Sequence, residues 1–171
     1  TTGIPTMDYF LTAQDAEPEH PEAHYTEKPV LLHNALACHT PPRFPETVPS
    51  RRELGLPEGM RLYTCPVQLF KLHPDMDAVF ARILDKDPQA CVILFSPPLP
   101  LWRPQLEARF AQTISPALRQ RIMFMPFVAK DVFANILRSV DAVLDPFHFS
   151  FGITAYLLFS LGIPFATWPG E

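Results

Sequence analysis

Short apolar runs alternate with longer amphipathic segments from Met60 to the end of the chain. The apolar runs have the length of β-strands and lie at residues 61–67, 91–95, 122–127, 140–144 and 164–168. They are apolar almost throughout rather than at every second position. This pattern is typical of strands that are buried on both faces of a parallel sheet.

Helical periodicity fills the intervals between these runs. Over residues 74–88 the apolar positions share the i, i+3, i+4, i+7, i+8 spacing of a single helix face; they are Met76, Val79, Phe80, Ile83 and Leu84. Similar patterns predict helices over 102–114, 130–140 and 154–162. Because strand and helix alternate in this way, the sequence predicts an α/β fold, a Rossmann-like parallel sheet with helices on both faces.

The first part of the chain has a different character. Of the 21 prolines, eight fall between Ala13 and Gly59, where they block helices and central strands. Residues 13–59 are therefore predicted to be an extended connecting segment. The chain begins without Met and enters structured-looking sequence directly, so we expect it to be a piece of a longer protein.

Composition narrows the class of protein. The chain has 171 residues, of which 47% are hydrophobic and 19% charged, as in a globular domain, and its net charge is −4. This charge offers no electrostatic footprint for nucleic acid, and no apolar run approaches the roughly 20 residues that span a bilayer. The three cysteines, Cys38, Cys65 and Cys91, have no metal-binding spacing and are predicted to be buried free thiols in a reducing, cytoplasmic compartment.

Two polar sequences follow the ends of predicted strands and begin the helices that come next. Gln68 and Lys71 precede the helix that starts near Pro74, where a lysine and the helix dipole can both attract an anion; a solvated surface lysine is the alternative. Lys130 and Phe133 open the helix after the third strand of this region. Phe133 can stack on a base, or it can pack in the core, because it also lies on the apolar stripe of its helix.

A third sequence, DPFHFSFGIT at 145–154, follows the fourth strand. Gly152 lets the backbone approach a ligand closely, and Thr154 is placed as an N-cap that offers its hydroxyl and the first helical N–H groups. The same capping role needs no ligand, so both interpretations stand. His148 is expected to be a packed, hydrogen-bonded histidine. Together the three loops suggest a nucleotide-like ligand at the carboxyl edge of the sheet.

Several familiar site types are missing from the sequence. It contains neither G-x-G-x-x-G nor G-x-x-x-x-G-K-[ST], the simplest dinucleotide and P-loop patterns. Its histidines form no H-E-x-x-H or comparable zinc-binding motif, so no zinc site, and no metal or other cofactor, is expected.

Five stretches carry a further signal, at residues 1–12, 24–32, 68–75, 144–149 and 161–171. In this order they resemble the O-linked N-acetylglucosamine transferase family (glycosyltransferase family 41), in particular its bacterial tetratricopeptide-linked and SPINDLY-like members. The resemblance implies a GT-B fold of two Rossmann-like lobes. Residues 1–12 would be the tail of the first lobe, 13–59 the crossover, and 60–171 most of the C-terminal, nucleotide-binding lobe.

The resemblance also implies roles for individual residues. Gln68 and Lys71 match a Gln-x-x-Lys motif whose lysine contacts the diphosphate and stabilises the leaving group, so Lys71 is the catalytic candidate. Lys130 matches a lysine beside the uracil, Phe133 stands where some members stack a histidine on the nucleotide, and Thr154 matches a phosphate-binding threonine.

The loop departs from the family pattern in two places. Leu157 replaces the acidic residue expected to hold the ribose hydroxyls, and Ile153 replaces a polar residue. Loss of a charged hydrogen-bond acceptor costs about 1.5–3 kcal/mol, roughly ten- to a hundredfold in affinity. Weak donor binding, a changed donor or a degenerate site would each follow.

Two functions are therefore open. The first is an inverting glycosyltransferase that moves a GlcNAc-like or fucose-like sugar from a nucleotide diphosphate to Ser or Thr hydroxyls of an acceptor protein. The second is a non-catalytic Rossmann-like binding module with a degenerate nucleotide site. For the first, the chain alone is expected to be inactive, since it lacks the first-lobe residues that face the acceptor.

Overall fold

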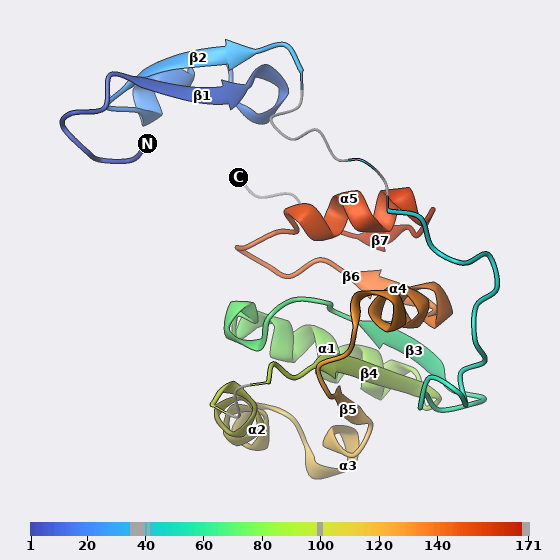
Figure 1. Cartoon of the computed structure of the whole chain (residues 1–171). Helices are drawn as coiled ribbons and strands as arrows, with labels where there is room; N and C mark the ends of the chain where they lie inside the picture. Colours follow the sequence, from blue (N-terminus) through green and yellow to red (C-terminus); the bar gives the residue numbers. More distant parts are fainter. Residues whose placement is uncertain (35–39, 41, 99–100, 169–171) are drawn as a thin grey trace. The chain divides into compact units, whose positions relative to one another are not determined.

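The computed structural model describes residues 1–34, 40, 42–98 and 101–168 (Figure 1). It divides into two compact units, Thr1–Thr40 and Pro41–Glu171. The domain boundaries predicted after residues 12 and 59 stay predictions. None of the helices in the described part of the chain is long and apolar enough to cross a membrane.

The first unit is built on two parallel strands. Strand β1 (Tyr9–Ala13) pairs with β2 (Lys28–Leu32), with Tyr9 opposite Lys28, and the single-turn 3-10 helices η1 (Gln14–Ala16) and η2 (Pro21–His24) lie between them in the chain. This pairing was not predicted from the sequence. Strand β2 contains Pro29, which a strand with an unpaired edge tolerates.

A buried carboxylate ties the start of this unit to the residues before β2. Glu27 is 4% exposed and accepts hydrogen bonds from the Thr1 hydroxyl at 2.7 Å and from the Thr2 backbone N–H at 2.6 Å. The hydrogen bonds from Thr2 and Thr1 lower the pKa of Glu27 well below its usual range. These bonds satisfy a charge that burial would otherwise penalise.

The second unit is the predicted α/β sheet. Its strands are β3 (Arg61–Thr64), β4 (Ala90–Phe95), β5 (Ile122–Met125), β6 (Ala142–Leu144) and β7 (Phe165–Ala166). Its helices are η3 (Leu69–Lys71), α1 (Asp75–Lys86), α2 (Trp102–Thr113), α3 (Pro116–Arg119), α4 (Lys130–Ser139) and α5 (Ile153–Ser160). All described pairings are parallel, in the order β5-β4-β3-β6-β7. The five predicted strands and four predicted helices are confirmed, whereas the short helices η3 and α3 were not predicted.

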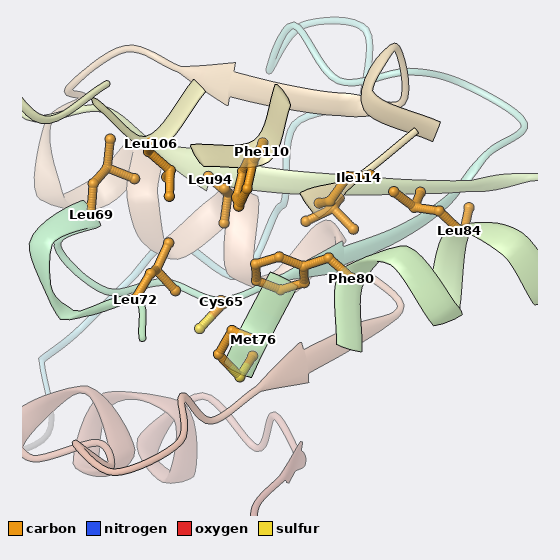
Figure 2. Close-up of a cluster of buried hydrophobic side chains, with 12 residues drawn as sticks. Cys65, Leu69, Leu72, Met76, Phe80, Leu84, Leu94, Leu106, Phe110 and Ile114 are labelled. Carbon is orange, nitrogen blue, oxygen red and sulfur yellow. The ribbon is translucent and has the colours of Figure 1, made fainter. Parts of the chain in front are cut away.

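Alternate residues of β4 point to opposite faces of the sheet, and helices cover both. Val92 and Leu94 belong to a cluster with α1 and α2, whose inward residues include Met76, Phe80, Leu106 and Phe110 (Figure 2). Cys91 and Ile93 face the other way and pack with Ile136 of α4. The Rossmann-like architecture, with helices on both faces, is thus confirmed.

Helix α5 covers the end of the sheet. Its Leu158 is fully buried against Leu137 of α4 and Val143 of β6. The other side of α5 is open, with Ile153 at 70% and Phe159 at 68% exposure. This helix is therefore anchored by one apolar face although nearly all of its residues are apolar.

The two described cysteines are buried free thiols, as predicted. Cys65 directly follows β3 and is completely buried, and this desolvation raises its pKa far above that of an exposed thiol. A thiol in that state is a poor nucleophile, so Cys65 is a core residue. Cys38 lies outside the described residues.

Candidate functional site

The site lies at the carboxyl ends of the strands, where the strand order reverses. From β3 the chain moves to β4 and β5 on one side, then crosses to β6 on the other side of β3. Loops that leave β3 and β6 diverge at such a point and form a crevice, which is where open α/β sheets bind ligands.

A pocket of about 380 Å³ occupies this crevice, within the range of small-molecule sites. It is lined by the loops that follow β3, β4, β5 and β6. All six residues singled out from the sequence line it, namely Gln68, Lys71, Lys130, Phe133, Gly152 and Thr154. The expected convergence on one cleft is therefore found, while the ligand-binding roles of these residues stay predictions.

Lys71 stands at the end of η3, in the loop after β3. The η3 turn is closed by the Lys71 N–H, which donates to the Gln68 carbonyl at 2.8 Å, and is anchored by the buried Leu69. The Lys71 ammonium lies 4.2 Å from the centroid of the Phe149 ring. No carboxylate of the described residues pairs with Lys71. Its charge is thus available to an anion in the pocket.

Lys130 and Phe133 come from the first turn of α4. Lys130 is the first residue of this helix, whose N-terminus has no side-chain cap. Phe133 is half-buried, and its ring meets that of Phe95 edge-on with centroids 4.8 Å apart. It also packs against the cluster beneath α5, which consists of the buried Leu137, Val143 and Leu158. Phe133 therefore packs in the core and also lines the pocket, and its stacking on a base stays a prediction.

The N-terminus of α5 forms the far wall. Here one expectation is wrong: Gly152, not Thr154, is the N-cap residue, and Thr154 is the second residue of the helix. The chain becomes helical earlier than the polar sequence indicated, because the Ala155 N–H already donates to the Gly152 carbonyl at 3.0 Å. No side-chain oxygen caps this helix, so its first N–H groups and the Thr154 hydroxyl are open to the pocket.

Asp145 organises the loop that leads to α5. This carboxylate is 6% exposed and accepts hydrogen bonds from the Phe151 N–H at 2.7 Å, the Ser150 hydroxyl at 2.5 Å and the Thr167 hydroxyl at 2.7 Å. No role for Asp145 was predicted from the sequence. The signal in the sequence was that this acidic residue directly follows a buried strand. A carboxylate can be buried there only if nearby groups donate hydrogen bonds to it.

Two other expectations change with the structure. His148 is hydrogen-bonded as expected, but it is not packed: its side chain is 61% exposed, and its backbone has a φ of 66°. Leu157 is half-buried against the cluster beneath α5 and is not one of the residues that line the pocket. It lies on the side of α5 that faces the sheet.

Comparisons with known proteins bear on this arrangement. No protein-family model matches the chain. It is 27% identical over 174 residues to a protein of Solanum lycopersicum named "Probable UDP-N-acetylglucosamine--peptide N-acetylglucosaminyltransferase SPINDLY", and 28% identical over 184 residues to the protein of Arabidopsis thaliana with the same activity name and the suffix SEC. The chain resembles O-linked N-acetylglucosamine transferases. Both matches cover 100% of this chain and 18% of the relative, so the chain spans about a fifth of each relative's length.

Solved structures agree on the fold. An O-GlcNAc transferase of Thermobaculum terrenum superimposes with a TM-score of 0.74 at 22% identity, over 94% of this chain and 30% of that one. A chain of the GtfA/B complex superimposes with a TM-score of 0.57 at 14% identity, over 96% of this chain and 31% of the other. The sheet is thus that of the C-terminal lobe of a GT-B fold.

Proposed function

We propose that the chain supplies the donor site of a larger glycosyltransferase, which moves a sugar from a nucleotide diphosphate to Ser or Thr hydroxyls of an acceptor protein. The observation that carries this proposal is the convergence of Lys71 and the uncapped N-termini of α4 and α5 on one pocket. A lysine and helix N-termini together suit a diphosphate. The sugar transfer and the protein acceptor are inferred from the names of the relatives.

The residues can share the work of binding the donor. Lys71 and the first N–H groups of α5 would hold the diphosphate, with the Thr154 hydroxyl as a further donor. Lys130 and the Phe133 ring, in the first turn of α4, would face the base. The open space in front of Gly152, where a Cβ would meet no protein atom within 4 Å, would leave room for the phosphates.

The proposed chemistry is a displacement at the anomeric carbon. The acceptor hydroxyl forms a bond to that carbon while the bond to the diphosphate oxygen breaks, and the electron pair leaves with the diphosphate. Lys71 and the α5 N-terminus stabilise this growing negative charge, which is where electrostatic catalysis is most effective. The hydroxyl proton passes to a base that this pocket does not provide. Under this proposal the protein supplies the positive charge without a metal cofactor.

The second interpretation, a binding module without catalysis, is not favoured by the comparisons, since the curated relatives are named as transferases. Its motivation was Leu157, and the structure places this residue in the packing beneath α5. We propose that the larger protein acts in the cytoplasm, and that the 171-residue chain by itself does not catalyse the sugar transfer.

Binding and transfer can be tested separately. Calorimetric titration of the chain with UDP, UDP-GlcNAc, GDP-fucose and uridine should show that a diphosphate is required, with uridine at least tenfold weaker than UDP. Transfer should then be assayed with labelled donor and protein acceptors, using a protein as long as the relatives. Equal affinity for UDP and uridine would refute the diphosphate assignment. Tight UDP binding without transfer by the longer protein would favour the binding module.

A further inference from the structure

Three side chains with metal-binding atoms meet beside the pocket. His73 and Asp75 lie at the start of α1, and His148 lies in the loop after β6. Each offers one ligand atom, and these three atoms lie within 4.8 Å of one another. All three residues are exposed, so a cation in solution can reach them.

The geometry already resembles a coordination shell. The His148 Nε2 and the Asp75 Oδ2 are 2.8 Å apart, and the His73 Nδ1 lies 3.3 Å from the same oxygen. The two imidazoles meet edge-on, with ring centroids 4.4 Å apart. Ligands at about 2.0–2.1 Å from a tetrahedral zinc are roughly 3.3 Å apart, so small rotamer changes would bring all three to one ion.

We propose that His73, Asp75 and His148 bind a divalent transition metal ion of the zinc class. Two imidazole nitrogens and one carboxylate favour such an ion over Mg²⁺ or Ca²⁺, which prefer oxygen ligands only. Three protein ligands leave a fourth position for water or for an oxygen of another ligand.

The position of this cluster indicates which segments a bound metal ion would connect. His73 follows Lys71 by two residues, and His148 directly precedes Phe149, whose ring contacts the Lys71 ammonium. An ion held by His73, Asp75 and His148 would cross-link the start of α1 to the loop after β6, joining segments 73 residues apart in sequence. It would thereby fix the two sides of the pocket mouth. The metal site does not depend on the proposed transfer.

The backbone of His148 adds a separate observation. Its φ of 66° lies in the left-handed region, and it is the one non-glycine residue with positive φ in the described part of the chain. Backbone conformations of this kind persist where surrounding contacts hold them and gather at functional sites. The bond to Asp75 is such a contact, and a metal ion would strengthen it.

The test is a titration of the full chain with Zn²⁺, and in parallel with Co²⁺, followed by calorimetry and visible absorption. We expect one saturable site, tetrahedral Co²⁺ bands, and a rise in melting temperature that a chelator reverses. His148→Asn keeps a side chain that tolerates positive φ, and His73→Gln keeps the length of the side chain. Each should weaken Zn²⁺ binding about tenfold or more without changing the metal-free melting temperature.

The matched control is His20→Gln. His20 lies in the first unit, is 84% exposed and has a carboxylate neighbour, Glu22, at 3.5 Å. It therefore represents an ordinary surface histidine, and its replacement should leave Zn²⁺ affinity unchanged. All measurements should be repeated in a Cys38→Ser background. Absence of a one-to-one site, or binding that survives in the His73→Gln/His148→Asn double variant, would overturn the proposal.

Discussion

Lys71 is the residue on which the proposed donor site depends most, and Lys71→Met tests it directly. Methionine keeps an unbranched side chain of similar length and removes the charged ammonium group with its N–H donors. Lys71 is half-buried at the end of η3 and makes no ion pair with the described residues, so its replacement breaks no structural salt bridge. The fold should therefore survive, and the loss should appear in diphosphate binding.

The magnitude follows from two opposing contributions. A charge-assisted bond between the ammonium and a diphosphate is worth about 1.5–3 kcal/mol. In the free protein the same ammonium lies 4.2 Å from the Phe149 centroid, a contact worth about 0.5–1 kcal/mol that is given up when Lys71 turns to the ligand. The net loss for Lys71→Met is therefore about 1–2 kcal/mol, which weakens UDP binding roughly 5- to 30-fold.

The assay is calorimetric titration with UDP, with uridine as a second ligand. Uridine lacks phosphates, so Lys71→Met should leave its affinity unchanged. Lys86→Met is the matched control, since it changes the net charge equally at the last residue of α1, near the opposite edge of the sheet. UDP affinity within twofold of the unmodified chain, or an equal loss in Lys86→Met, would refute the assignment of Lys71 to the diphosphate.

Three further substitutions test other parts of the structure. Thr154→Val should weaken UDP binding by about 0.5–1.5 kcal/mol while Thr154→Ser does not, because only the hydroxyl can donate to a phosphate; equal titration curves for both would contradict this. Leu157→Glu should lower the melting temperature without improving UDP affinity, since it places a carboxylate in the half-buried packing beneath α5. Tighter UDP binding at an unchanged melting temperature would show that this side chain faces the nucleotide instead. Asp87→Asn tests the pH dependence of stability. The hydrogen bonds from Arg61 lower the pKa of Asp87 to about 2, so the folded state binds a proton on this carboxylate less readily than the unfolded chain does. The unmodified chain should be more stable than Asp87→Asn, with the full difference present above the unfolded pKa of about 3.9 and lost as the pH falls through about 2. The free energy of unfolding should be measured by denaturant titration, and a difference that does not change with pH would contradict this prediction.

Much of the second unit could be predicted from local pattern. The apolar runs at 91–95 and 122–127 correspond to β4 and β5, and the stripe over 74–88 corresponds to α1, where Met76, Phe80 and Leu84 are buried. These predictions succeed because periodicity records which side of a segment must leave water, and that requirement acts within a few residues. The same locality explains why boundaries were less exact, as at the start of α5.

The polar residues at strand ends could also be selected from sequence, since parallel strands place their carboxyl ends at a single edge of the sheet. Gln68, Lys71, Lys130 and Thr154 do line one pocket. The missed feature was Asp145, because its importance comes from three donors that assemble around it only in the folded loop. The proposal of a nucleotide-sugar donor came from the resemblance to O-linked N-acetylglucosamine transferases, because local chemistry suggested only a nucleotide-like ligand.

The sequence by itself determined the five strands and four main helices of the second unit, their apolar faces and the residues that carry charge at the ends of the strands. Only the tertiary structure decided the strand order, and with it the reversal between β3 and β6 that opens the pocket. It alone paired β1 with β2, turned Leu157 toward the sheet, and brought His148 to His73 and Asp75. The physical reason is that burial preferences are local, whereas strand order and contacts between distant residues depend on how all the crossovers pack together.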